Sequence, residues 1–379
     1  MNLRRDAPKT GVPTERWVAL LGHRDFPTDG VEDYCRYLGE ALALQGVLLR
    51  IARVDWMGEG WLRALWKLRL ERAGWNSSWI LMQYTALAWS RRGFPFGALL
   101  VLGILRRQGL RCAVVYHEPI ALKGAGLIGG IRTACQRWIL RELHRQSDMS
   151  VMTAPTRTID WLPQEDSKAV FIPIGPNIPA PPAANGDGAA KNGKPLTVAV
   201  YCVDPPPYRE RELQDIAGAV LPAAKQGTPL RILFFGKGTV DAKDEIEQTF
   251  HQTGIEVSIL GLLEPGKLQQ SLLESDALLS VRGAVYLRRG TAIAGVACGL
   301  PVVGYADETD IFPLSEAGLR LVPRGDQPAL ARALADVLRD PNLREDLRAR
   351  SRRAHRSIFA WDVIAKSFQE ALTKPRALG

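Results

Sequence analysis

Cysteine is scarce in this sequence, and the few cysteines do not form a recognisable framework. Five occur among 379 residues, far apart and never as a C-x-x-C pair. An odd number of scattered cysteines is typical of free, mostly buried thiols, and it excludes both a disulfide-rich scaffold and a cysteine zinc site. We therefore expect a protein of a reducing compartment.

Long apolar runs are also missing. The longest, near Gly97–Leu105, stops at Arg106 and Arg107, well short of the roughly 20 apolar residues that a membrane span needs. Residues 1–13 are polar and contain no segment that could act as a signal peptide. The expectation is a cytoplasmic protein whose contact with a membrane is peripheral at most.

Sequence signatures of metal sites and phosphate loops are absent as well. There is no H-E-x-x-H, no paired His/Cys cluster and no Walker sequence. A recognisable nucleic-acid reader motif is also missing. We therefore expect no protein-built metal site, no resident cofactor and no nucleic-acid partner.

What the chain does have is a basic first half. Residues 1–180 carry 24 Lys and Arg against 16 Asp and Glu, a charge of +8, whereas residues 181–379 carry 25 against 24, a charge of +1; together they give the net +9 of the whole chain. Such an asymmetry indicates an anionic partner for the first half. A phospholipid surface or a phosphorylated acceptor fits better than a nucleic acid, because no reader motif is present.

Short apolar runs alternate along the chain with segments long enough for helices, on both sides of one segment rich in Pro, Ala and Gly. This alternation predicts two doubly wound α/β domains with parallel sheets. The strands predicted in the first half are Trp17–Gly22, Val47–Ile51, Trp79–Gln83, Cys112–Tyr116 and Met149–Thr153. Those predicted in the second half are Leu196–Cys202, Leu230–Phe235, Val257–Leu260, Ala277–Ser280 and Pro301–Gly304. The predicted helices include Val31–Leu44, Arg209–Ala224, Lys267–Leu273, Ala292–Cys298, Pro328–Arg339 and Leu343–Ala354.

The same pattern gives the domain boundaries. We place the first domain at residues 1–180, a flexible linker at 181–195, the second domain at 196–358 and a last segment at 359–379. Two such lobes are expected to face each other across a cleft lined by the carboxyl ends of their strands, where ligands bind in open α/β sheets.

Two strand ends in the first half carry candidate site residues. Asp29 and Gly30 precede the first helix, where backbone N–H groups and the helix dipole suit a phosphate or a sugar hydroxyl; an ordinary βα turn is the alternative. His117 and Glu118 follow the apolar run ending at Tyr116, so that the imidazole could orient or deprotonate an acceptor hydroxyl. A hydrogen-bonded histidine and a solvated glutamate are the alternatives there.

The second half offers a cationic strand-to-helix junction at Arg282–Thr291. Arg288 and Arg289 would stand beside a helix whose first N–H groups come from Gly290 and Thr291, and guanidinium groups with free amides hold diphosphates well. An arginine pair without a role is the alternative. Gly236 and Lys237, after another strand, could approach a nucleotide, but they lack a dinucleotide fingerprint and are interpreted first as a turn.

Six of the ten tryptophans fall between Trp56 and Trp89, interleaved with Arg and Lys. Trp together with basic residues is typical of a lipid headgroup interface. An amphipathic helix that packs its apolar side into the core of the first domain explains the same pattern, and both interpretations stand.

The order of these segments resembles the large retaining glycosyltransferase family 4 (glycosyl transferases group 1), which has GT-B architecture and builds bacterial polysaccharides and lipid-linked glycans. PTDGVEDYCRYLGEALALQG is similar to that family's opening glycine loop and first helix, and VVYHEP to a middle strand. LRILFFGKG and GVACGLPVVGYADETD follow the donor-lobe pattern, and FAWDVIAKSFQEAL resembles the final helix that returns to the first lobe.

The resemblance implies an acceptor in the first lobe, a nucleotide sugar in the second, and lobe closure around both. His117 matches the family's strand-end histidine, and Gly30 matches the first-loop glycine near the donor phosphates. Asp29 and Glu118 would then lie on the acceptor side, and Gly236, Lys237 and the Arg282–Thr291 segment on the donor side.

The chain departs from the family at two places. The family commonly has two glutamates separated by seven intervening residues before the A-C-G segment, and those positions fall on Tyr286 and Ala294. The usual phosphate clamp after the first donor-lobe strand is replaced by a segment ending in Arg209. We expect Arg209, Arg288 and Arg289 to supply the positive charge, since transition-state charge develops on the leaving diphosphate.

Together these features predict a hexosyltransferase that uses a nucleotide-diphosphate sugar and a lipid-linked or polysaccharide acceptor at the cytoplasmic membrane face. A non-catalytic scaffold that binds sugar nucleotides, and a sugar-nucleotide epimerase on the same fold, are the alternatives. The residues do not specify the sugar, the base, the acceptor or the stereochemical outcome.

Overall fold

The chain forms two compact units. The computed structural model describes residues 15–25, 28–75, 77–122, 124–179, 195–225, 229–307 and 310–373. Unit 1 comprises the chain up to Ile172 and from Ile364 onward, and unit 2 runs from Pro173 to Val363. The linker predicted at 181–195 lies, apart from Pro195, outside the described residues. Helix α12 (Trp361–Thr373) contains the boundary at which the chain re-enters unit 1.

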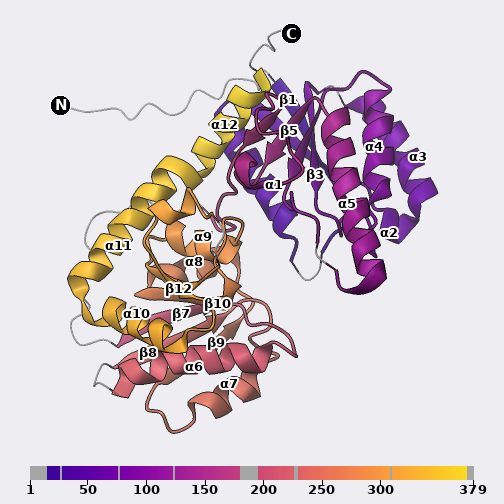
Figure 1. Ribbon diagram of the computed structural model, residues 1–379. Helices are drawn as coiled ribbons and strands as arrows, with labels where there is room; N and C mark the ends of the chain where they lie inside the picture. The colour runs from indigo at the N-terminus through magenta and orange to yellow at the C-terminus, as the bar shows by residue number, and fades with distance from the viewer. Residues whose placement is uncertain are drawn as a thin grey trace, which may run out of the picture. The chain divides into compact units, whose positions relative to one another are not determined.

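Unit 1 is built on a six-stranded parallel sheet in the order β2-β1-β3-β4-β5-β6 (Figure 1). Its strands are β1 (Glu15–Leu21), β2 (Val47–Arg53), β3 (Trp79–Tyr84), β4 (Cys112–Tyr116), β5 (Met149–Met152) and β6 (Ala169–Phe171). Its helices before the boundary are α1 (Gly30–Leu44), α2 (Trp56–Glu59), α3 (Trp61–Glu71), α4 (Phe96–Arg106) and α5 (Gly126–Gln146). Strands β3 and β4 are buried at every residue, as expected for strands covered by helices on both faces.

Unit 2 repeats the plan with a six-stranded parallel sheet in the order β12-β11-β10-β7-β8-β9. Its strands are β7 (Leu196–Tyr201), β8 (Leu230–Phe235), β9 (Glu256–Gly261), β10 (Ala277–Ala284), β11 (Val302–Ala306) and β12 (Leu319–Pro323). Its helices are α6 (Arg209–Lys225), α7 (Lys243–Phe250), α8 (Pro265–Leu273), α9 (Gly290–Ala297), α10 (Gln327–Arg339) and α11 (Pro341–Ala354). The prediction of two doubly wound parallel sheets is confirmed, and the predicted strands are all present, while β6, β12 and α7 were missed.

Each sheet has a point at which the strand order reverses. In unit 1 the chain moves from β1 outward to β2 and then returns to add β3 on the other side of β1. In unit 2 it moves from β7 through β8 to β9 and then returns to add β10 beside β7. In open α/β sheets ligands bind outside the carboxyl ends of the strands at such points. The segments after β7 and β10 are therefore the first place to look for a site in unit 2.

The tryptophan-rich segment of unit 1 packs mainly into the core. Trp56, Trp75, Trp79 and Trp89 are buried, and the ring of Trp61 stacks on Trp56 with centroids 5.2 Å apart. The core interpretation of this segment is confirmed for these residues. Trp66 differs, because 64% of its surface is exposed on α3.

The packing of Trp61 against α4 gives a test of this core. A Cβ on Gly97 would lie 1.9 Å from the Trp61 ring, whereas a Cβ on Gly103 of the same helix would meet no atom within 4 Å. Gly97→Ala should lower the free energy of unfolding by roughly 1–3 kcal/mol through overpacking. Gly103→Ala should raise it by about 0.5–1 kcal/mol through helix propensity. Denaturant unfolding of both variants measures this, and equal effects of the two substitutions would contradict the packing described.

Candidate nucleotide-sugar site

An ion pair joins the two strand ends at the reversal point of unit 2. Asp204 follows β7, and Arg282 stands near the end of β10. The Asp204 Oδ1 atom accepts from Arg282 Nε at 2.7 Å and lies 2.6 Å from Arg282 Nη2. A guanidinium that grips a carboxylate through two nitrogens is equally suited to grip a phosphate.

A buried carboxyl group lies beneath this ion pair. Glu212, in the first turn of α6, is 4% exposed, and its Oε2 accepts from the backbone N–H of Asp204 at 2.6 Å. Its Oε1 has no hydrogen-bond partner among the residues that the structure describes. Burial raises the pKa of Glu212 to about 7, and the nearby Asp204 charge adds to this rise while Arg282 and Arg289 oppose it. The carboxyl thus titrates near neutral pH and holds the β7–α6 loop in place.

Arg289 is the N-terminal flanking residue of α9 and belongs to the same cluster. Its Nη2 donates to the backbone carbonyls of Arg282 (2.5 Å) and Ala284 (3.2 Å), and its guanidinium carbon lies 4.8 Å from the centroid of the Tyr286 ring. Within the described ranges its buried Nε has no acceptor, and burial lowers the pKa of this guanidinium. A partly buried cation with an unfilled donor is suited to an anionic ligand.

The other residues of this junction lie where the sequence predicted them, around the start of α9. Gly290 and Thr291 are its first two residues, and the guanidinium carbon of Arg288 lies 5.5 Å from the centroid of the Tyr286 ring. Asn177 approaches Gly290, since a Cβ on Gly290 would lie 3.9 Å from the Asn177 Oδ1. The Asn177 amide donates to the Tyr201 hydroxyl at 3.2 Å.

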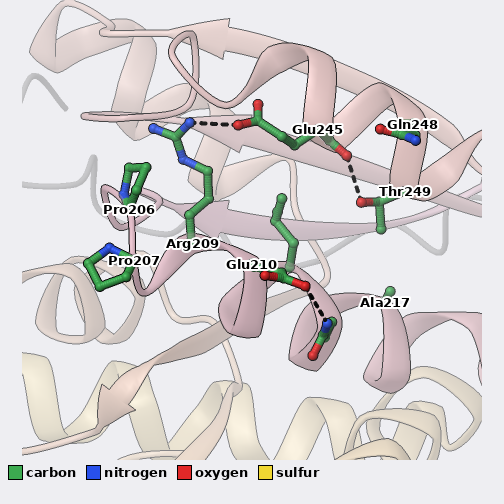
Figure 2. Close-up of a pocket in the computed structure, with 10 residues that line it drawn as sticks. Pro206, Pro207, Arg209, Glu210, Ala217, Glu245, Gln248 and Thr249 are labelled. Atoms are coloured by element: carbon green, nitrogen blue, oxygen red, sulfur yellow. Dashed lines mark hydrogen bonds and ion pairs between the residues drawn. The ribbon is translucent and has the colours of Figure 1, made fainter.

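Arg209, the first residue of α6, donates from its Nε to the Asp204 backbone carbonyl at 3.3 Å but does not bind the Asp204 carboxylate. Its Nη1 binds the Glu245 carboxylate and the Asp241 carbonyl, each at 2.9 Å, and Figure 2 shows the guanidinium directed toward Glu245. Arg209 and Glu245 border a pocket of about 520 Å³ between α6 and α7, whose walls include Pro206, Pro207 and Leu213. Arg209 thus fixes the loop that carries Asp204 rather than joining the Asp204–Arg282 pair.

Gly236 and Lys237 form the tight turn after β8, as the simpler interpretation predicted. Gly236 has φ +95°, and a Cβ there would lie 2.8 Å from the Cys202 sulfur. The carbonyl of Lys237 accepts from the Val203 N–H at 3.0 Å, while its side chain is exposed. This turn supports the β7–α6 loop from the neighbouring strand.

In unit 1, His117 stands directly after β4. Its backbone N–H donates to the Tyr84 carbonyl, its Nε2 lies 2.8 Å from the Gln83 Oε1, and its ring packs edge-on against Tyr34. Because the Gln83 amide nitrogen donates to the Leu81 carbonyl, its oxygen faces the imidazole, which assigns the proton to Nε2. Because Nε2 carries the proton, Nδ1 is the ring nitrogen of His117 that would have to act as a general base.

The other candidates of unit 1 have structural partners. Glu118 accepts from the Ala86 N–H at 3.1 Å and so ties the loop after β3 to β4. Asp29 caps α1 by accepting from the N–H groups of Val31 and Glu32. Gly30, the first residue of α1, is exposed, and a Cβ there would meet no atom within 4 Å. A phosphate at this helix terminus would compete with the Asp29 carboxylate.

Sequence reasoning missed Asp204, the partner of Arg282, and Glu212, which binds the Asp204 N–H. One signal was available for Glu212, because it stands on the buried stripe of α6 with Ile216 and Val220 at spacings of four residues. A carboxyl on the apolar face of a helix needs a special partner. No comparable signal marked Asp204, whose partner lies 78 residues away.

Neither a metal cluster nor a membrane-spanning helix is found in the part of the chain that the structure describes. No three His, Cys, Asp or Glu side chains there are grouped so as to hold a metal ion. The helices there are all too short or too polar to cross a bilayer.

The titration of Glu212 makes stability depend on pH. Its ordinary pKa is 4.5 and its folded value about 7, so the folded state binds the extra proton between these values, and the free energy of unfolding falls as pH rises through this window. The full loss is about 3 kcal/mol. Glu212→Gln, which keeps an acceptor for the Asp204 N–H, should raise the melting temperature clearly at pH 8 and little at pH 5.

Glu210→Gln is the matched control, since Glu210 is an exposed neighbour on α6. It should leave the pH dependence of the melting temperature unchanged. A Glu212→Gln effect of the same size at both pH values would show that the carboxyl does not titrate in this window.

Comparison of the sequence with known protein families finds no match, and comparison with curated proteins finds none either. Solved structures do match. Sucrose-phosphate synthase from Thermosynechococcus elongatus has 18% identity and a TM-score of 0.64, with 94% of this chain and 98% of that chain covered. HepE from Anabaena, solved with UDP and glucose, has 13% identity and a TM-score of 0.63 over 95% and 99% of the two chains. WaaG, a glycosyltransferase involved in lipopolysaccharide biosynthesis, has 12% identity and a TM-score of 0.63 over 94% and 100%. The fold of this chain is the GT-B fold of these proteins, with two Rossmann-like units.

Proposed function

We propose that the protein is a glycosyltransferase that moves a hexose, with retention, from a nucleotide-diphosphate donor to a lipid-linked or polysaccharide acceptor. The observation that carries the proposal is the cationic cluster of Arg282 and Arg289 at the reversal point of unit 2, beside the N-terminus of α9. HepE, on the same fold, was solved with UDP and glucose, which supports a nucleotide sugar as the donor.

The chemistry follows from where charge develops. As the bond to the sugar breaks, negative charge grows on the leaving diphosphate, and cations with helix-terminal N–H groups stabilise it best when they are already fixed in place. Arg289 is fixed by two carbonyls, whereas Arg282 is held by the Asp204 carboxylate, which the donor phosphate would have to displace. In unit 1, His117 Nδ1 would orient or deprotonate the acceptor hydroxyl. The donor serves as a co-substrate, and no bound metal is required by this scheme.

One observation favours the scaffold alternative and has to be tested with the main proposal. The positions of the two family glutamates are occupied by Tyr286, which is 38% exposed, and by the fully buried Ala294. Neither can bind a sugar hydroxyl as a carboxylate does. Nucleotide-sugar binding without any turnover would support a binding protein that has lost its catalytic groups.

A donor screen tests the proposal. Among UDP, GDP and ADP sugars, one should raise the melting temperature by roughly 5–10 °C at a hundredfold excess over its Kd. Arg289→Ala should weaken that ligand about 10–100-fold and lower turnover, since it removes a charge-assisted contact. Arg320→Ala, which removes an exposed cation on β12 paired with Asp336, is the matched control and should bind normally. If no sugar nucleotide shifts the melting temperature, the donor assignment is wrong.

Asp204 gives a second test, because the donor phosphate would have to displace its carboxylate from Arg282. Asp204→Asn keeps the backbone N–H that binds Glu212 but removes the competing charge, so the affinity for UDP, measured by calorimetry, should rise about tenfold. Asp241→Asn is the control, since only the backbone carbonyl of Asp241 binds Arg209. Unchanged or weaker UDP binding by Asp204→Asn would exclude Arg282 as a phosphate ligand.

A further inference from the structure

Two neighbouring helices of unit 1, α4 and α5, carry a set of exposed apolar side chains, as α2 and α3 do with Met57, Leu62, Trp66 and Leu70. Figure 1 shows these helices alongside each other, and the rings of Phe96 on α4 and Trp138 on α5 lie 6.3 Å apart. Leu127 is 81% exposed. We call this set the α4–α5 face, and its members are Phe96, Leu100, Leu127, Ile128, Ile131 and Trp138. Exposed apolar side chains gathered on neighbouring helices indicate an interaction site.

A cationic groove of about 600 Å³ adjoins this face. Arg137, Trp138 and Arg141 of α5 line it together with the exposed Gly130. Arg137 and Arg141 are four residues apart and so lie on one side of the helix. Arg137 forms an ion pair with Asp160, whereas Arg141 makes no hydrogen bond or ion pair with any residue in the described ranges.

The apolar face and the adjoining groove lie on a helix with a large excess of positive charge. The α5 helix carries Arg132, Arg137, Arg141 and Arg145 against the single acid Glu142, which pairs with Arg145. An amphipathic helix with apolar and aromatic side chains beside an excess of arginine is suited to the boundary between headgroups and acyl chains of an anionic bilayer. The basic excess of the first half of the chain has the same sign.

We propose that the α4–α5 face is a membrane-binding surface, and that the groove of Arg137, Trp138 and Arg141 holds the phosphate of an anionic phospholipid headgroup. Leu127, Ile128 and Ile131 enter the acyl region, while the guanidinium groups contact the headgroup phosphates. The inference rests on the proposed function only in that a lipid-linked acceptor gives the surface a purpose. The α4–α5 face lies outside Trp56–Trp89, the segment for which the sequence suggested membrane contact.

Vesicle flotation of the full chain tests this surface. The native protein should float with vesicles of phosphatidylcholine and phosphatidylglycerol, and not with phosphatidylcholine alone. Arg137→Gln with Arg141→Gln should weaken binding to the anionic vesicles roughly tenfold, because each arginine near an anionic surface contributes about a factor of five and Arg137 is shared with Asp160. Leu127→Ser with Ile128→Ser should abolish flotation.

Matched controls keep the test sharp. Arg50→Gln removes an exposed cation of β2, and Leu44→Ser removes a leucine that is 83% exposed at the end of α1; both should float like the native protein. Flotation equal in the native protein and in the α5 variants overturns the proposal. Binding of soluble glycerol phosphate without vesicle binding also overturns it, because the groove would then hold a free phosphate. A native dimer that dissociates in the Leu127→Ser with Ile128→Ser variant overturns it as well, because the face would then bind a second copy of the chain.

Calorimetry with the donor in the absence of vesicles separates this inference from the proposed function. The α5 variants should bind the donor like the native protein. If the native protein floats with anionic vesicles but binds no donor, the membrane-binding surface is supported and the proposed glycosyltransferase function is wrong.

Discussion

The candidate site depends on one constraint, the need to hold two partly buried arginines at the end of a parallel sheet, where solvent stabilises them only in part. Arg282 meets that need through the Asp204 carboxylate, and Arg289 through two backbone carbonyls and the face of Tyr286. Partly buried cations cost free energy unless they are paired. The groups that surround them are therefore as much a part of the site as the arginines themselves.

The buried Glu212 follows from the same constraint. A carboxyl beneath the β7–α6 loop binds the Asp204 N–H, and that bond fixes the loop from which the Asp204 side chain reaches Arg282. Arg209 fixes the far end of the loop through Glu245 and Asp241. The β7–α6 loop is thus held at both ends, and its Asp204 carboxylate binds Arg282, an arginine that the resemblance would assign to the donor.

Much of the fold could be predicted from the sequence, because strands buried on both faces are near-continuous apolar runs, as in β4 and β10. The three-residue β6 is too short to give a pattern, and the partly exposed β12, which contains Arg320 and ends at Pro323, lacks the apolar run of a buried strand. For the site, the positions of His117 and of the Arg282–Thr291 segment could be predicted, because residues at strand ends are placed by the sheet itself. Their partners could not, since the pairing of Arg282 with Asp204 and of His117 with Gln83 joins residues 78 and 34 positions apart.

The central claim is that the ends of β7 and β10 bind the diphosphate of a nucleotide sugar. Hydrogen–deuterium exchange with and without the donor identified by screening tests this most directly. The account predicts that the donor slows exchange in residues 202–209 and 282–291, where the β7–α6 loop and the start of α9 lie. Unchanged exchange in both segments, with protection elsewhere in the chain, would contradict it.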